Sequence, residues 1–116
     1  MITPDNFRKV ALSFPETAEA PHFDRRAFRT PKRIFATMQA EKFLANLKFS
    51  VIDQDVFCRI NAEIIYPIPN KWGLQGWTQI NLKKISGKLL RDALETAYRE
   101  AMPVKPARAV KPGRKT

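Results

Sequence analysis

The sequence contains few of the residues that stabilise folds through covalent bonds or metal ions. Its 116 residues include one cysteine, Cys58, and one histidine, His22. A lone cysteine has no partner for an intrachain disulfide, and a structural zinc site takes four cysteine or histidine ligands. We therefore expect no disulfide, no metal and no other cofactor, and a hydrophobic core that stabilises one domain. Unpaired cysteine is typical of the reducing cytoplasm, where we expect the protein to reside.

Long hydrophobic runs are also absent. No apolar stretch approaches the roughly 20 residues of a membrane-spanning helix, and none resembles the hydrophobic part of a secretory signal. We therefore expect no membrane association. The sequence does not indicate an oligomeric state, and a monomer is the default expectation.

Acidic residues are outnumbered almost two to one. Lys and Arg total 21 against 11 Asp and Glu, a net charge of +10, and residues 105–116 hold five of these bases and no acid. Residues 1–104 thus carry 16 bases and 11 acids, or +5. The last residues, which include Pro103, Pro106 and Pro112, bury too little apolar surface to order. We predict a folded domain over 1–102 and a disordered basic tail over 103–116. Such a tail attracts any polyanion, or simply raises solubility.

Hydrophobic periodicity predicts three helices. Thr3 is a suitable N-cap for a helix over residues 4–14, and Ser86 for a closing helix that ends before Pro103. Asp53 is placed to cap a second helix. The apolar stripe expected on that second helix consists of Val56, Phe57, Ile60 and Ile64.

Alternating residues predict antiparallel strands over 17–23, 26–30, 33–38, 43–49 and 77–82. In the fourth, Phe43, Ala45, Leu47 and Phe49 share the core face, so Lys48 points away from it. In the fifth, Thr78, Ile80 and Leu82 share the core face, opposite Trp77, Gln79 and Asn81. Residues 64–68 decide whether a further strand pairs here. The sequence predicts an α+β two-layer sandwich, with an antiparallel sheet of about five strands and helices packed on one face.

Residues 71–78, KWGLQGWT, contain both tryptophans and two of the four glycines. Glycine permits positive φ or close backbone approach, so we interpret this segment as a shaped loop leading into a strand. It presents a ligand site or packs a corner, and the sequence leaves both interpretations open.

Basic residues gather in a predicted hairpin around Phe28: Arg25, Arg26, Arg29, Lys32 and Arg33. Their side chains are suited to contacting phosphates along a groove, a contact that gives affinity without sequence information. Charges that protect a sheet edge from aggregation explain the same pattern.

A second candidate cluster lies on the non-core faces of two strands. Lys48 and Asn46 on one strand, with Trp77 and Gln79 on the other, would let an unpaired base stack beside a cation. Tryptophan is more commonly packed, with its N–H bonded internally. Lys71, the first residue of the tryptophan segment, is a further basic residue.

His22 stands two residues before Asp24, a spacing that can orient a general base if the strand continues. No serine or cysteine is recognisably placed as a nucleophile, so we expect no enzymatic activity. His22 can instead belong to a ligand pocket with Lys48, Trp77 and Gln79.

Five ordered motifs resemble the MmcQ/YjbR family of small bacterial proteins over about residues 5–101: ALSFPE at 11–16, PHFDRRAFR at 21–29, KRIFAT at 32–37, ANLK at 45–48 and WGLQGWTQI at 72–80. The resemblance implies a compact α+β domain related to the frataxin-like class and a DNA-binding, double-wing function. The recurrent family positions it implies here are His22, Phe28, Phe35, Lys48, Gly73, Gly76 and Trp77. The acidic iron-binding ridge of frataxins is contradicted by the basic composition.

Two functions remain open at this point. The first is a nucleic-acid-binding module that contacts phosphates, mainly of DNA, through the hairpin, Lys48, Lys71, Trp77 and the tail. The alternative is a domain that binds a protein or a small ligand in a pocket around His22, Lys48 and Trp77, with its charge selecting an acidic partner.

Overall fold

A computed structural model describes residues 1–102, so the predicted disordered tail at 103–116 lies outside the described residues. The elements follow one another as α1 (Pro4–Ala11), β1 (Ala18–His22), β2 (Arg25–Arg29), β3 (Ile34–Gln39), the 3-10 turn η1 (Ala40–Lys42), β4 (Leu44–Lys48), α2 (Val51–Cys58), β5 (Ile65–Pro67), α3 (Lys71–Leu74), β6 (Trp77–Asn81) and α4 (Gly87–Ala101). No helix in this part of the chain is long and apolar enough to cross a membrane.

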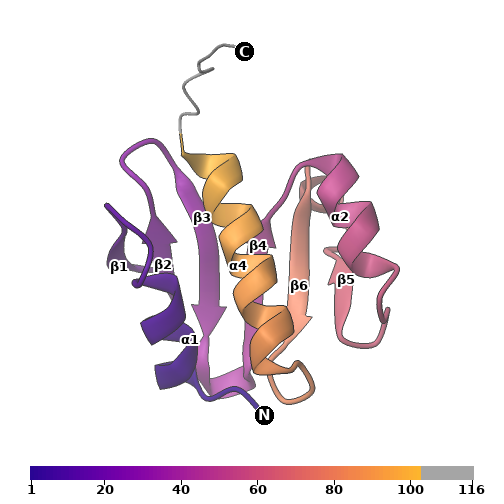
Figure 1. Ribbon diagram of the computed structural model, residues 1–116, viewed down its shortest axis with the longest axis horizontal. Helices are drawn as coiled ribbons and strands as arrows, with labels where there is room; N and C mark the ends of the chain where they lie inside the picture. The colour runs from indigo at the N-terminus through magenta and orange to yellow at the C-terminus, as the bar shows by residue number, and fades with distance from the viewer. Residues whose placement is uncertain (103–116) are drawn as a thin grey trace.

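The strands form a single antiparallel sheet of six strands in the order β1-β2-β3-β4-β6-β5. Figure 1 shows α1 and α4 lying over one face of this sheet, with α2 beside them near β5 and β6. The predicted α+β two-layer architecture is confirmed. The count of about five strands becomes six because residues 65–67 pair with β6 at the sheet edge.

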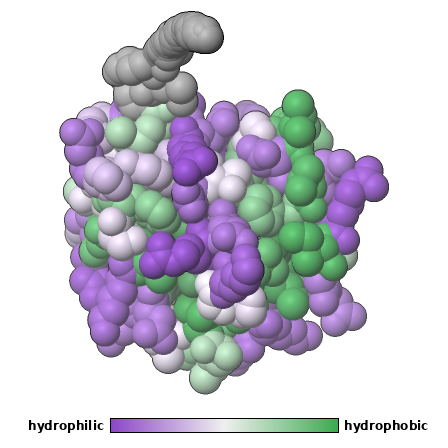
Figure 2. All heavy atoms as spheres, in the orientation of Figure 1, coloured by the Kyte–Doolittle hydropathy of each residue, from purple (hydrophilic) through white to green (hydrophobic). Residues whose placement is uncertain are grey.

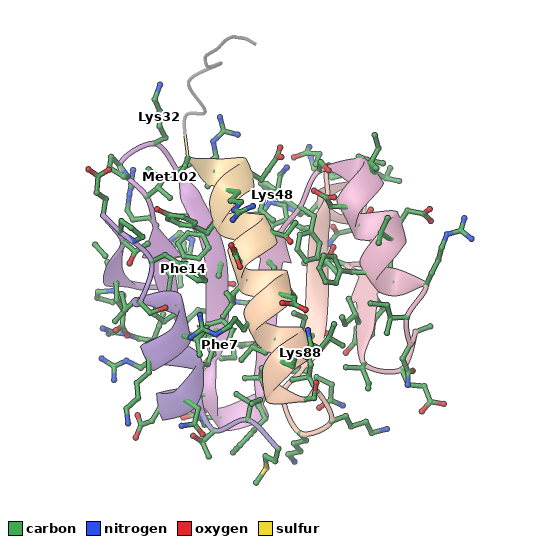
Figure 3. The ribbon with its side chains drawn as sticks, viewed as in Figure 1. Phe7, Phe14, Lys32, Lys48, Lys88 and Met102 are labelled. Carbon is green, nitrogen blue, oxygen red and sulfur yellow. The ribbon has the colours of Figure 1, made fainter. Side chains whose placement is uncertain are left out.

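The core lies between the sheet and the pair α1 and α4. Phe7 of α1 meets Phe28 of β2 edge to face, with ring centroids 5.5 Å apart, and Phe14 stacks on Tyr98 of α4 at 4.8 Å (Figure 3). Ala45 and Leu47 are buried on the core face of β4, as their alternation predicted. Lys48 takes the opposite face, because its neighbour Leu47 fills the core.

The first two helices begin or end differently from the prediction. α1 ends at Ala11 rather than at residue 14, and the Ser13 hydroxyl donates to the Val10 carbonyl. α2 begins one turn earlier than expected, because the Ser50 hydroxyl accepts from the Asp53 N–H at 3.0 Å.

The buried face of α2 is also different. Val56 and Ile60, predicted to be buried, are each 55% exposed. The prediction holds for Phe57, which stacks on Phe49 at 4.9 Å, and for Ile64, which packs against the core. Gln54 is also buried on the inner side. α2 ends at Cys58, so Ile60 follows the helix and does not continue its buried face.

The tryptophan segment, predicted as a shaped loop leading into a strand, forms a single helical turn, α3, and then leads into β6. Asn70 Oδ1 caps it by accepting from the Trp72 N–H at 2.8 Å. A Cβ on Gly73 would lie 1.9 Å from the Ile68 carbonyl oxygen, and one on Gly76 would lie 1.9 Å from the Phe49 carbonyl oxygen. Both glycines are therefore required for the close approach of this segment to β5 and β4.

We predict that Gly76→Ala lowers the free energy of unfolding by about 3 kcal/mol or more, since φ at this position is +108° and the added methyl group meets backbone. Gly87→Ala is the matched control. Its new methyl group would have nothing closer than Ile2 Cδ1 at 4.0 Å, so the change should be neutral or stabilise by up to about 1 kcal/mol. Urea unfolding of both variants checks this, and equal stabilities would contradict it.

Candidate functional site

The face of the sheet opposite α1 and α4 carries a row of polar side chains. Thr37, Asn46, Gln79 and Tyr66 occupy paired positions across β3, β4, β6 and β5. Tyr66 Oη donates to Gln79 Oε1 at 3.1 Å. In one orientation of the Asn46 amide, its oxygen accepts from Gln79 Nε2 at 3.2 Å. In the opposite orientation, which satisfies the amide better, the Asn46 oxygen instead accepts from Arg25 Nη1 at 2.6 Å, and this bond holds Arg25 over the open face.

A cavity of about 370 Å³ lies on this open face. The central strands form its floor, and its walls come from the β1–β2 turn on one side and the segment around α3 on the other. Its lining consists of His22, Phe23, Asp24, Arg25, Thr37, Asn46, Ile68, Asn70, Trp72 and Trp77. This volume is at the lower end of the range of small-molecule sites.

Aromatic side chains dominate the walls of this cavity. Phe23 is 95% exposed at the tip of the β1–β2 hairpin, with φ at +60°, and its ring lies 4.9 Å from the ring of His22. Trp72 is 52% exposed on α3, while Trp77 on β6 is half-buried. Neither Phe23 nor Trp72 was predicted to belong to the site. The sequence predicted a strand that includes residue 23, whereas β1 ends at His22 and Phe23 lies in the turn before Arg25.

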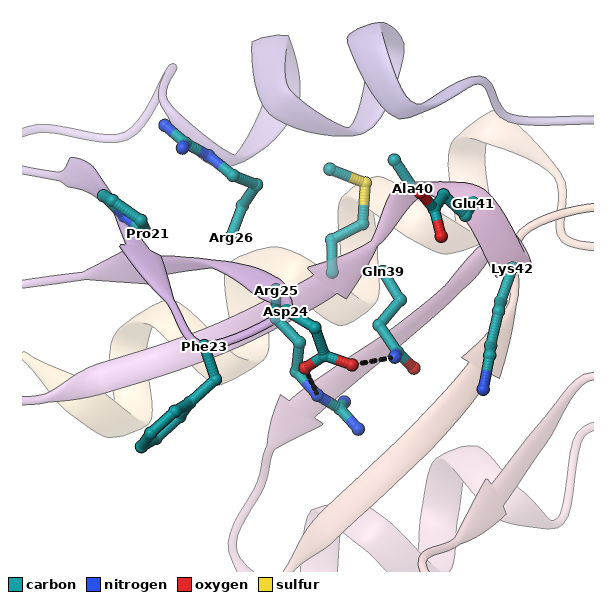
Figure 4. A pocket seen from close by; sticks show the side chains of 10 residues that line it. Pro21, Phe23, Asp24, Arg25, Arg26, Gln39, Ala40, Glu41 and Lys42 are labelled. Atoms are coloured by element: carbon teal, nitrogen blue, oxygen red, sulfur yellow. Dashed lines mark hydrogen bonds and ion pairs between the residues drawn. The ribbon is translucent and has the colours of Figure 1, made fainter.

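Asp24 stabilises the turn rather than pairing with histidine. β1 ends at His22, so the predicted placement of His22 and Asp24 on one strand face does not occur. Asp24 accepts from Gln39 Nε2 at 3.0 Å and lies 3.7 Å from Arg25 Nε (Figure 4). A second cavity, of similar volume, adjoins the other side of this turn, and both cavities share Phe23, Asp24 and Arg25.

Gln54 of α2 holds the α3 wall in place. Its buried Nε2 donates to the Gly73 carbonyl at 2.9 Å, to Thr78 Oγ1 at 3.1 Å and to the Trp77 carbonyl at 3.2 Å. A single amide thus links α2 to both ends of the tryptophan segment. Because Gly73 directly follows Trp72, the bond from Gln54 to the Gly73 carbonyl helps to fix the position of Trp72 in the cavity wall.

Lys48, Gln79 and Lys71 lie near the cavity but do not line it. Lys48 pairs with Trp77 across the ladder, and its Nζ donates to the Phe49 carbonyl at 3.1 Å. Gln79 belongs to the polar row. Lys71 is exposed at the first position of α3, beside Trp72. Of the predicted pocket residues, His22 and Trp77 come together around one cavity, whereas Lys48 and Gln79 form its surroundings.

The basic hairpin does not present one cationic surface. Arg26 turns to the helix side and donates to Glu19 Oε2 at 2.7 Å, where Arg8 of α1 also binds the same carboxylate at 2.9 Å. Arg25 projects over the open face. The other three basic residues lie at the opposite end of the hairpin and are exposed: Arg29, Lys32 and Arg33. Arg25 and Arg26 are adjacent in sequence, but their side chains point to opposite faces of the sheet because neighbours in a strand alternate.

No group of His, Cys, Asp and Glu among residues 1–102 is arranged to hold a metal ion. Cys58 is half-buried at the end of α2, and burial together with the nearby Asp55 raises the pKa of its thiol. A thiol of raised pKa is a poor nucleophile at neutral pH.

Glu19 provides a test of the Arg8–Glu19–Arg26 cluster. Burial alone would raise its pKa, but hydrogen bonds and charge from Arg26 and Arg8 outweigh burial, so the pKa lies below the ordinary value of 4.5. Because the folded-state pKa is depressed, this stabilisation is present above pH 4.5 and is lost as the pH falls through the folded pKa.

We therefore predict that Glu19→Gln costs about 1 kcal/mol at pH 7, where the partly exposed arginines limit the gain, and that the difference from wild type vanishes toward pH 3. Urea unfolding of both proteins at several pH values measures this. A pH-independent difference would show that the charge of Glu19 contributes nothing.

Comparisons with known proteins identify relatives in sequence and in structure. The YjbR family model matches residues 12–100. A crystal structure from Deinococcus radiodurans, with a DUF419 domain, superposes with a TM-score of 0.71 at 19% identity, covering 84% of this chain and 76% of that one. A Pseudomonas syringae crystal structure gives 0.65 at 17% identity, covering 87% and 100%. No curated protein matches. These structures share the fold, and the family match over most of the domain places the chain in the YjbR family.

Proposed function

We propose that this protein binds single-stranded nucleic acid on the open face of its sheet, with one unpaired base held in the aromatic cavity. Phe23, Trp72 and Trp77 supply stacking surfaces, and Arg25 supplies a cation and hydrogen-bond donors beside them. Aromatic platforms combined with basic side chains are the common means of binding unpaired bases.

The exposure of Phe23 is the observation that carries this proposal. A phenylalanine that is 95% exposed contributes almost nothing to the core. Its positive φ follows from the two-residue turn between His22 and Arg25. The packing of the domain does not account for so large an apolar side chain at this exposed position, whereas a stacking partner in the adjoining cavity would.

The distribution of charge favours a single strand over a duplex. A wing that lies along a duplex groove needs cations along one edge, but Arg26 is paired with Glu19 on the helix side. Arg29, Lys32 and Arg33 are exposed at the far end of the hairpin and are positioned to contact the phosphates of a flexible strand that leaves the cavity. Lys71, beside Trp72, is placed to make a similar contact.

The cavity itself supports a second candidate. A small planar acid would fit among His22, Arg25 and Trp77, with Lys48 and Gln79 in the surroundings, and would need no phosphate contacts outside the cavity. Binding of a mononucleotide and of an oligonucleotide distinguishes the two functions, because only the oligonucleotide is long enough to reach Arg29, Lys32 and Arg33.

We predict that the full chain binds a short oligo(dT) with quenching of its tryptophan fluorescence. Phe23→Ala and Trp72→Ala should each weaken binding about ten- to a hundredfold, the usual worth of one stacked base. Leu12→Ala, which removes a partly exposed apolar side chain at the end of α1, is the control and should bind as wild type. Unchanged affinity in both aromatic variants would contradict stacking in the cavity.

Salt dependence tests the phosphate contacts separately. The triple variant with Arg29→Ala, Lys32→Ala and Arg33→Ala should reduce the slope of log affinity against log salt by about 2 for a single strand. Lys88→Ala, whose side chain is 87% exposed on α4, should leave the slope unchanged. Repeating the titration on residues 1–102 measures the share of the basic tail. If removal of the tail abolishes binding, the folded domain does not bind the strand.

A further inference from the structure

A second cavity lies on the other side of the β1–β2 turn, and the function proposed above does not use it. Its volume is about 370 Å³, equal to that of the first cavity, which Trp72 and Trp77 wall. The residues that line it but not the first cavity include Pro21, Met38, Ala40 and Lys42. Phe23, Asp24 and Arg25 line both cavities, so the two spaces are neighbours that share one wall.

Phe23 belongs to the shared wall, and both faces of its ring are accessible. The side chain is 95% exposed, so the ring of His22, whose centroid lies 4.9 Å away, covers little of it. A base stacked in the first cavity would cover one face of the Phe23 ring and leave the other face uncovered. Because either face of an aromatic ring stacks on a base, the uncovered face offers a second position for stacking.

Lys42 lies across the second cavity from Phe23. Figure 4 shows the two side chains projecting in the same direction, on either side of the hydrogen-bonded pair Asp24 and Gln39. Lys42 is exposed, and none of the ion pairs among residues 1–102 involves it. Its ammonium group is therefore available to the phosphate of a nucleotide whose base stacks on Phe23.

The charges around the second cavity favour a nucleotide over a free anion. Its lining includes side chains of both signs: Arg25, Arg26, Lys42, Asp24 and Glu41. Glu19 also lies close by and holds Arg26, so three basic residues are balanced by three acidic ones. A small anion gains little from such a space, whereas an uncharged base fits its interior while the phosphate lies at Lys42.

We propose that the second cavity binds a second base, so that Phe23 inserts between two consecutive bases of one unpaired strand. Trp72 stacks on the first base, Pro21 lies beside the second, and Lys42 contacts the phosphate beyond it. Apolar side chains that insert between the bases of a duplex must unstack base pairs. An unpaired strand has no pairs to break, so the same insertion costs less. This second position depends on the proposed function and extends that site from one base to two.

Two ligands of equal charge test the second position. The probe is a thymidine dinucleotide phosphorylated at both ends, and its control is the same molecule with one base removed from its sugar. By NMR titration, the full chain should bind the two-base ligand about ten- to a hundredfold more tightly, the usual worth of a stacked base. In Phe23→Ala this ratio should fall to about threefold or less, because the second base loses its stacking partner. Circular dichroism checks that the variant is folded.

Salt dependence with a short oligo(dT) tests Lys42. Lys42→Ala should lower the slope of log affinity against log salt by about 0.7, the value for one phosphate contact of a single strand, and Lys42→Arg should retain the slope. Lys88→Ala is the matched control and should leave the slope and the two-base ratio unchanged. Lys88 is exposed on α4, over the covered face of the sheet, and Figure 2 shows hydrophilic side chains along this helix.

The outcomes distinguish the second position from the function on which it depends. Oligo(dT) binding that is weakened by Phe23→Ala and Trp72→Ala supports the proposed function, and the two-base ratio then decides the second position. Equal affinity for the two ligands, an unchanged ratio in Phe23→Ala, or an unchanged salt slope in Lys42→Ala would each overturn the second position while binding of one base stands. Failure of every ligand to bind would overturn both.

Discussion

The close contact of two glycines with backbone carbonyls determines how the open face is built. Gly73 lies against Ile68 and Gly76 against Phe49, at distances that leave no room for a side chain. These contacts, together with the amide of Gln54, hold α3 against the β5–β6 edge. Were the segment displaced, the cavity would lose one wall and β5 would lose part of its support. A constraint on the backbone therefore underlies both the sixth strand and the candidate site.

The two faces of the sheet have different roles because the helices cover only one of them. Phe7, Phe28 and Leu47 fill the covered face and stabilise the domain. On the open face, the amide row centred on Asn46 satisfies buried polar groups without filling the space above them. The open face therefore has a polar, hydrogen-bonded floor between aromatic walls.

The positive charge of the chain is not a uniform property of its surface. Arg26 is held by Glu19, Arg25 crosses the open face, and the bases from Arg29 to Arg33 lie at the far end of the hairpin. Around α2 the balance reverses, and apolar groups accompany the acids. The positive charge is therefore distributed unevenly over the described residues.

The sequence by itself determined the architecture, because alternation in strands and the capping residues Thr3 and Ser86 act locally. It also predicted that Lys48 and Trp77 face away from the core. Only the tertiary structure decided which residues meet: α2 packs inward through Gln54 and Phe57, which leaves Val56 exposed, and the turn at Phe23 brings one hairpin tip opposite α3. Hydrophobic periodicity and secondary-structure propensity depend on residues that are close together in the sequence. A cavity depends on the relative position of segments that are far apart in the sequence, and this position is determined by packing.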